Sequence, residues 1–266
     1  MDTVTNFIRQ SAYRLAWVVV LGVLSLLSLG ADFLVVALGD RYLQVGTARE
    51  FLARSWNFGA CAAADTVGLE AATQFVGRVT GTHPEATGMS ALGGTAGAEL
   101  SLLQLTQAYT LFPNNGLQVA ATPFLAYAQD GARVALPRPV PPRVAEAGAT
   151  SVTTDMLRGV VSAGGTAPNF RAQAGLAASV NFAGKTGSGT RADLWFVGFT
   201  PRLVVGVWAG MPNNEVALTL EKGFSGGNVA APVAAAFLRS VAQQRPELLA
   251  GEFAQPANIA TRRADR

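Results

Sequence analysis

The stretch GKTGSGTRADLWFVGFTPRLVVGVWAG, residues 184–210, decides the fold. It contains two apolar, β-rich runs, 194–199 and 203–209, which a Thr-Pro-Arg turn separates. This pattern predicts an antiparallel hairpin, and its continuous hydrophobicity is typical of a sheet that is covered on both faces. A strand over residues 179–184 is expected to lead into Lys185-Thr186-Gly187 just before the hairpin.

Helical patterns precede and follow this region. The sequence therefore predicts an α+β domain, in which an antiparallel sheet is flanked by helices. A further pair of strands, joined at Asp130-Gly131, is expected between residues 117 and 134. The expected helices are 50–56, ending near Asn57-Phe58-Gly59, then 66–79, a helix capped by Ser101, 150–161, and a closing helix capped by Asn228 with Val229, Val233, Phe237 and Val241 on its apolar face.

The N-terminal part of the chain is strongly apolar. The run LAWVVVLGVLSLLSLGA, residues 15–31, has no charge and resumes after Asp32 as FLVVALG. A membrane helix needs about 20 mainly apolar residues. Two arginines precede the run and two aspartates follow it, so the positive-inside rule places the N-terminus in the cytoplasm. The alternative is a buried core helix of a soluble domain.

No internal repeat or long low-complexity linker divides the rest of the chain. We expect residues 1–40 to hold a cytoplasmic N-terminus and a single transmembrane helix in the cell (inner) membrane. Residues 41–250 are expected to form one partial domain outside the cytoplasm, and residues 251–266 a loosely ordered tail.

Composition excludes several classes of function. The net charge is only +3, and no basic patch is interleaved with aromatic residues, so nucleic-acid binding is not expected. The single cysteine, Cys61, and the single histidine, His83, rule out an intramolecular disulfide and metal-ligand spacing built from these residue types. We therefore expect no metal and no cofactor. Lysine is nearly absent, because Lys185 and Lys222 are the only two.

Residues 184–190 combine one lysine with small hydroxyl residues and glycines. At a strand edge, such a strip offers one positive charge beside hydroxyl donors, and its glycines let a ligand backbone approach closely. It therefore suits an anionic carboxylate. A phosphate-binding loop is excluded, because that motif needs a glycine where Ser179 stands.

Four separated blocks resemble the transpeptidase domain of class A penicillin-binding proteins, in the order of that family and over about residues 47–247. The first is the 184–210 stretch, and the others are ELSLLQLTQAYTLFPNNG, TTDMLRGVVSAGGTA and GFSGGNVAAPVAAAFLRSV. The resemblance implies a serine β-lactamase/transpeptidase-like fold. It also implies peptidoglycan stem peptides and β-lactams as ligands, the membrane as location and other cell-wall synthesis proteins as partners.

The family's active site uses three motifs, Ser-x-x-Lys, Ser-x-Asn and Lys-Thr-Gly. By resemblance, Ser55-Trp56-Asn57 is the second motif, in which Ser55 relays a proton and Asn57 holds the substrate amide. The third motif then assigns positive potential to Lys185 and carboxylate binding to Thr186 and Ser188, with Gly187 and Thr190 in the same strip. Without the resemblance, Ser55 and Asn57 would be read as residues that cap a helix end.

The first motif is missing, because no Ser-x-x-Lys occurs anywhere in the chain. The sequence most similar to this motif is Ser11-Ala12-Tyr13-Arg14, in which arginine replaces the lysine, so Ser11 is a weak candidate for the nucleophile. An arginine stays protonated and cannot deprotonate a serine. A membrane helix after residue 14 would also place Ser11 on the opposite side from Lys185, across about 30 Å of bilayer.

Three functions follow from this pattern. One is a membrane-anchored D,D-transpeptidase that acts through a serine acyl-enzyme. The second is a truncated or degenerate relative that keeps the fold and a ligand groove and serves as a binding or scaffold protein. The third, a β-lactamase or carboxypeptidase, fits the blocks less well and also requires the missing serine.

Because the nucleophile motif is missing, we expect the purified protein to form no covalent adduct with a fluorescent penicillin on a denaturing gel. A labelled band that disappears in Ser11→Ala would contradict both the predicted membrane topology and the prediction that the protein is inactive. A band that disappears only in a variant of another serine, such as Ser55→Ala, would reveal an unorthodox nucleophile.

Overall fold

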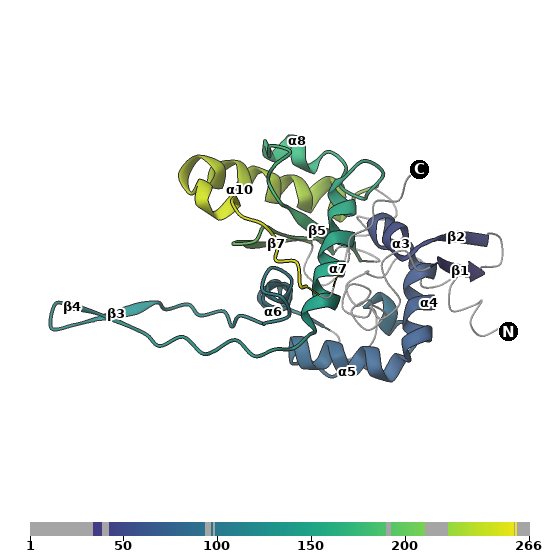
Figure 1. Cartoon of the computed structure of the whole chain (residues 1–266), viewed down its shortest axis with the longest axis horizontal. Helices are drawn as coiled ribbons and strands as arrows, with labels where there is room; N and C mark the ends of the chain where they lie inside the picture. Colours follow the sequence, from purple (N-terminus) through teal and green to yellow (C-terminus); the bar gives the residue numbers. More distant parts are fainter. Residues whose placement is uncertain are drawn as a thin grey trace.

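The structure of the chain is a computed structural model that describes residues 34–38, 43–93, 97, 99–189, 193–210, 223–257 and 259. At its centre is an antiparallel sheet of three strands in the order β5-β6-β7 (Figure 1). These strands are β5 (Ala183–Ser188), β6 (Leu194–Phe199) and β7 (Val204–Ala209). The predicted hairpin is confirmed. The strand predicted over residues 179–184 begins only at Ala183, because a turn closes just before it, with the Val180 N–H donating to the Ala177 carbonyl at 3.0 Å.

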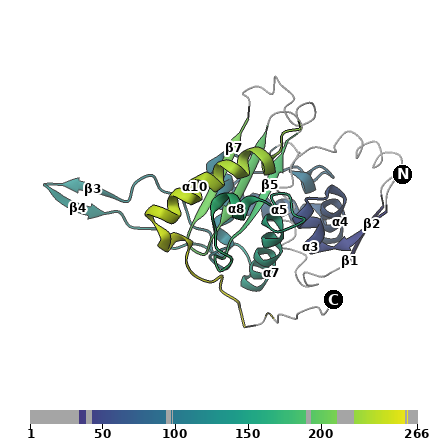
Figure 2. The ribbon, with the colours of Figure 1, turned by 90° about the horizontal axis from the view of Figure 1, so that it is seen from above.

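Helices surround the sheet, as the α+β prediction requires. They are α3 (Ala48–Arg54), α4 (Asn57–Val67), α5 (Leu69–Thr80), α6 (Leu102–Ala108), α7 (Ala147–Arg158), α8 (Phe170–Ala174) and α10 (Ala231–Gln244), together with the π-helix η5 (Gly226–Ala230) and the 3₁₀ helices η1 (Ser90–Leu92), η2 (Tyr109–Leu111), η3 (Gly159–Val161) and η6 (Pro246–Leu249). Helices α8 and α10 lie on one side of the sheet and α6 on the other (Figures 1 and 2).

Strand β6 is buried on both faces. Phe196 stacks on Phe170 of α8 with ring centroids 4.7 Å apart, and Phe199 stacks on Phe112 at 5.4 Å. Because successive side chains of a strand point to opposite faces, Phe196 and Phe199 reach the two different layers. The expected two-sided coverage of this strand is therefore confirmed.

The predicted helix ends before the sheet need one correction. Helix α3 matches the predicted helix over residues 50–56, but the predicted break at Asn57-Phe58-Gly59 is wrong, because α4 begins at Asn57. Helix α3 ends instead at Ser55, which adopts a left-handed conformation with φ 55°. The helix predicted from residue 66 begins at Leu69, since Thr66 and Val67 still belong to α4.

The expected cap of the closing helix is wrong, and its expected apolar face is only partly confirmed. Ser225 is the cap, and Asn228 is its partner in a capping box at the start of η5. Val241 is buried as expected, but Val233 and Phe237 are 54% and 49% exposed. The rest of the buried face is formed by Ala231, Ala234, Ala235 and Leu238. Short alanine side chains on the buried face let α10 pack closely on its neighbours. The cap predicted at Ser101, by contrast, is confirmed for α6.

The beginning of the expected loose tail is ordered against the body. Phe253 contacts Phe199 with ring centroids 5.6 Å apart, and the Asn181 side chain donates to the Gly251 carbonyl at 2.9 Å. Residues 251–253 of the expected tail therefore contact the body of the domain. Residues 261–266 lie outside the described part of the chain.

The predicted membrane run, residues 15–31, lies outside the described residues. Its expected continuation does not form a helix, because Leu34–Leu38 is a strand, β1, that pairs antiparallel with β2 (Leu43–Thr47). Within the described residues, no helix has both the length and the apolar character needed to cross a bilayer.

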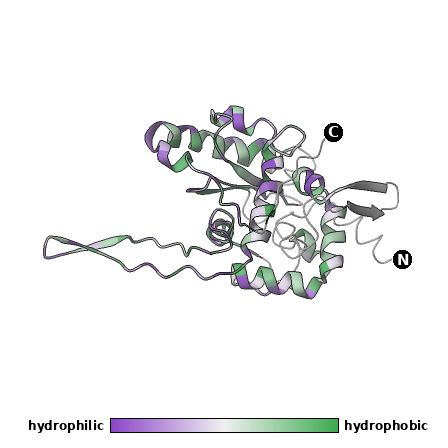
Figure 3. Cartoon of the chain, viewed as in Figure 1, coloured by the Kyte–Doolittle hydropathy of each residue, from purple (hydrophilic) through white to green (hydrophobic). Residues whose placement is uncertain are grey.

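A two-stranded arm extends away from the body (Figure 1). Its strands are β3 (Ala126–Gln129) and β4 (Ala132–Ala135), and they turn at Asp130 and Gly131, both of positive φ, as the sequence predicts. Hydrophobic residues occur along the arm as well as in the body (Figure 3), and Phe124 and Leu125 at its base are 67% and 55% exposed.

Candidate active site

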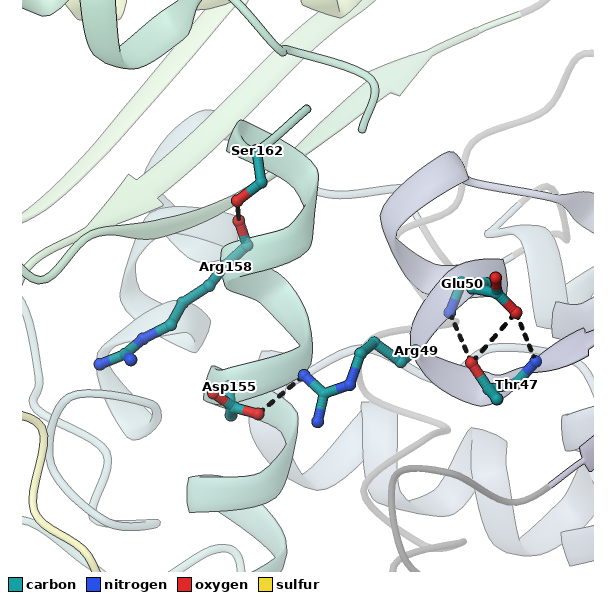
Figure 4. Close-up of polar contacts among 6 residues, drawn as sticks. All are labelled: Thr47, Arg49, Glu50, Asp155, Arg158 and Ser162. Carbon is teal, nitrogen blue, oxygen red and sulfur yellow. Dashed lines mark hydrogen bonds and ion pairs between the residues drawn. The ribbon is translucent and has the colours of Figure 1, made fainter. Parts of the chain in front are cut away.

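Helix α3 carries the first part of the site and is held at its start. At its start, Thr47 and Glu50 form a capping box, in which the Glu50 N–H donates to Thr47 Oγ1 at 3.2 Å (Figure 4). An ion pair joins Arg49 to Asp155 of α7 at 2.7 Å. The pair is partly exposed and contributes at most about 1 kcal/mol, but it sets α3 beside α7. These contacts position the end of α3, where Ser55 lies.

Ser55 ends the helix with its backbone and leaves its side chain for another contact. Its N–H donates to the Leu52 carbonyl at 3.2 Å, and the Trp56 N–H donates to the Phe51 carbonyl at 3.0 Å. A left-handed conformation is unfavourable for a residue other than glycine, by about 1 kcal/mol or more. The edge contact of the Phe51 and Trp56 rings, at 5.3 Å, helps to hold the turn.

Lys185 of β5 meets Ser55 across the fold. Its Nζ donates to Ser55 Oγ at 2.8 Å and to the Thr186 carbonyl at 2.8 Å, and its side chain is fully buried. The two residues are 130 positions apart in the chain. The backbone of Ser55 thus caps the helix, while its hydroxyl contacts Lys185.

The environment of Lys185 changes its chemistry. Burial lowers the pKa of its ammonium group from 10.5 to about 7, because the charged form loses its hydration. Near neutral pH the group can therefore attract a ligand carboxylate in its charged form or take a proton from Ser55 in its neutral form. The pair thus has the geometry and proton affinity of a proton relay.

The hydroxyl residues of the strip follow Lys185 along β5. Thr186 is buried, and its Oγ1 is 2.6 Å from Oγ1 of Thr166. Ser188 Oγ accepts a hydrogen bond from the Gly226 N–H at 3.0 Å. Residue 226 must be a glycine, because a Cβ there would overlap the carbonyl oxygens of Gly187 and Trp195.

The structure places most of the predicted site residues. It brings Ser55, Lys185, Thr186, Gly187 and Ser188 together, and Asn57 opens α4 two residues after Ser55. Thr190, Ser11 and Lys222 lie outside the described residues.

Two contributors were not predicted from the sequence, Thr166 and Gly226. Thr166 follows two glycines in a stretch that reads only as the end of a helix, and a lone threonine there carries no local pattern. Gly226 lies in a glycine pair before the closing helix, which indicates a turn but not a contact with β5. Among the described residues, no group of histidine, cysteine and acidic side chains could hold a metal ion.

The buried lysine makes stability depend on pH. Between about pH 7 and 10.5, the folded state binds fewer protons at Lys185 than the unfolded state does. The free energy of unfolding therefore rises with pH in this window, by at most about 1.4 kcal/mol per pH unit from this group. We expect urea denaturation to show that wild type gains stability relative to Lys185→Met as pH rises from about 7 to 9. A difference that stays constant with pH would contradict the burial of a titrating amine.

Comparison with known proteins identifies the family of the chain. The family model described as the penicillin binding protein transpeptidase domain matches residues 39–239. Penicillin-binding protein 1A of Aquifex aeolicus is 34% identical over 203 residues, which are 75% of this chain and 26% of that protein. Penicillin-binding protein 1A of Clostridium botulinum is 32% identical over 183 residues, which are 66% of this chain and 21% of that protein. The chain thus spans about a quarter of the length of these relatives.

Solved structures share the fold at low sequence identity. Penicillin-binding protein 1A from Haemophilus influenzae superposes with a TM-score of 0.71 at 17% identity, over 91% of this chain and 43% of that one. The transpeptidase domain of penicillin-binding protein 3 from Burkholderia pseudomallei gives 0.61 at 22% identity, over 85% of this chain and 77% of that one. The family match, the ordered sequence blocks and the Ser55–Lys185 geometry lead to one conclusion: the chain belongs to the penicillin-binding protein transpeptidase family.

Proposed function

We propose that the chain is a penicillin-binding, transpeptidase-like protein that binds the D-Ala-D-Ala end of peptidoglycan stem peptides, and β-lactams, reversibly and without completing acyl transfer. The observation that carries this proposal is the buried contact between Lys185 and Ser55, with the hydroxyls of Thr186 and Ser188 beside it. Sequence relatives support the ligand class, since those named above are penicillin-binding proteins.

The site offers what a peptide carboxylate requires. Lys185 supplies a positive charge at neutral pH and below, and Thr186 and Ser188 supply two hydroxyl protons. Strand β5 stands at an edge of the described sheet, a position where an extended peptide can add as a further strand. Charge-assisted hydrogen bonds of this kind are about twice as strong as neutral ones.

The missing nucleophile favours binding over turnover. Acyl transfer in this family begins at the serine of Ser-x-x-Lys, which this chain lacks. Ser55 and Lys185 can hold and relay a proton, but a relay alone forms no bond to a carbonyl carbon. The geometry therefore suits a binding or scaffold role better than that of an independent enzyme.

The ligand and the lysine proton should be coupled. A bound carboxylate favours the charged form of Lys185, so binding takes up a proton when the pH is above its pKa of about 7. We expect the affinity for N-acetyl-D-Ala-D-Ala to fall as pH rises above this value, by at most about tenfold per pH unit. Titration calorimetry in two buffers of different ionisation enthalpy measures both the affinity and the proton uptake.

Variants give this experiment its controls. Lys185→Met should lose both the affinity and its pH dependence, whereas Ser162→Ala, an exposed hydroxyl that only donates to the Arg158 carbonyl, should keep both. The stereoisomer N-acetyl-L-Ala-L-Ala tests specificity. Equal binding of both dipeptides, or binding unchanged in Lys185→Met, would refute the proposed site.

We also propose that residues 15–31 anchor the chain in the cell membrane with the domain outside the cytoplasm. The support is the uncharged apolar run and its flanking charges. The full chain should stay in the membrane pellet through an alkaline wash, and alkaline phosphatase fused after residue 266 should be active. Release by the wash would favour a buried helix, and an inactive fusion would reverse the topology.

A further inference from the structure

Thr166 touches the candidate site from outside the two motifs that form it. It follows η3, and its Oγ1 lies 2.6 Å from Oγ1 of Thr186. Thr166 is half-buried, and Thr186 is buried. A contact this short joins two hydroxyls, and either could be the donor.

The backbone of Thr166 is fixed by neighbours on several sides. Its N–H donates to the Ala53 carbonyl of α3 at 3.2 Å, and the next residue, Ala167, donates to the Val160 carbonyl at 2.9 Å. The Thr166 carbonyl lies so close to Gly227 of η5 that a Cβ there would overlap it. Thr166 therefore sits at the junction of α3, β5 and η5, and its hydroxyl has a defined position.

The direction of the Thr166–Thr186 hydrogen bond determines whether the Thr186 hydroxyl proton is available to a ligand. Each hydroxyl has one proton, so only one of the two protons lies between Thr166 and Thr186. If Thr166 donates, the proton of Thr186 is free for a ligand. A bound carboxylate favours this order, because each hydrogen bond in a chain polarises the next one toward the negative charge.

Ser188 also has a hydroxyl proton that is available to a ligand. Its oxygen accepts a hydrogen bond from the Gly226 N–H at 3.0 Å, so its proton is also free to point elsewhere. Thr186 and Ser188 are two residues apart on β5 and therefore share a side of the strand. Ser188 accepts a hydrogen bond from outside the strand, and Thr186 does the same when Thr166 donates, which then leaves two donors for the two oxygens of a carboxylate.

We propose that Thr166 is a positioning residue, which donates its proton to Thr186 and thereby directs the Thr186 proton toward the ligand carboxylate. This inference rests on the proposed function, because it concerns the same carboxylate. It adds a residue outside the Ser-x-Asn and Lys-Thr-Gly motifs to the recognition of that group.

The test compares two ligands in two variants of the full chain. The ligands are N-acetyl-D-Ala-D-Ala and its C-terminal amide, which lacks the negative charge. Thr166→Val removes the hydroxyl at nearly constant shape, and Thr166→Ser keeps it. We expect Thr166→Val to weaken binding of the free acid by roughly fivefold to tenfold, the size of one lost hydrogen bond. Binding of the amide should change less than about twofold, and Thr166→Ser should behave like wild type.

Coupling and folding are checked in the same series. In a Thr186→Val background, Thr166→Val should have no further effect on the free acid, since its acceptor is gone. Thermal unfolding of Thr166→Val and Thr166→Ser separates misfolding from a local effect. An equal loss for acid and amide, or a full loss that persists in the Thr186→Val background, would show a merely structural role and overturn the inference.

The outcomes also separate the two proposals. If wild type binds acid and amide equally, the proposed carboxylate site fails, and this inference fails with it. If wild type prefers the acid and Thr166→Val keeps the full preference, only the role of Thr166 is refuted.

Discussion

The buried ammonium group of Lys185 is the constraint on which the rest of the site depends. An amine removed from water must find acceptors, and here they come from Ser55 and from the carbonyl of Thr186. One acceptor is local, but the other lies 130 residues away. The end of α3 and the edge of the sheet must therefore be brought together with an accuracy of about a hydrogen-bond length.

Packing far from Lys185 provides that accuracy. The aromatic stacks on both faces of β6 fix the sheet, and β5 takes its register from β6. On the other side, the capping box and the Arg49–Asp155 pair set α3 against α7. Thr166 then ties α3, β5 and η5 to one another. The site is a meeting point of elements that are each stabilised elsewhere, which is how a strained residue such as Ser55 can be tolerated.

Local pattern predicts local structure well in this chain and long-range contact poorly. The hairpin of β6 and β7, the cap at Ser101 and the turn at Asp130-Gly131 follow from hydrophobic runs and turn residues. That Ser55 and Lys185 belong to one site was expected only through the family resemblance, since no spacing rule joins residues so far apart. The face of α10 was predicted only at Val241, because large residues dominate a hydrophobic pattern, whereas most of the buried face consists of alanines. Thr166 was missed because a hydrogen bond between a loop residue and a strand residue far along the chain produces no periodic pattern in the sequence.

The β3–β4 arm has a practical consequence for work with this protein. Its tip at Asp130 and Gly131 is exposed and turns tightly, and the arm points away from the body that contains the site (Figure 1). Exposed loop tips are the places where chains best accept inserted sequence and are first cut by proteases. The tip therefore offers an attachment point for a fluorophore or an affinity tag that leaves the packing around β5 intact, and it is also where limited proteolysis would divide the chain into two associated pieces.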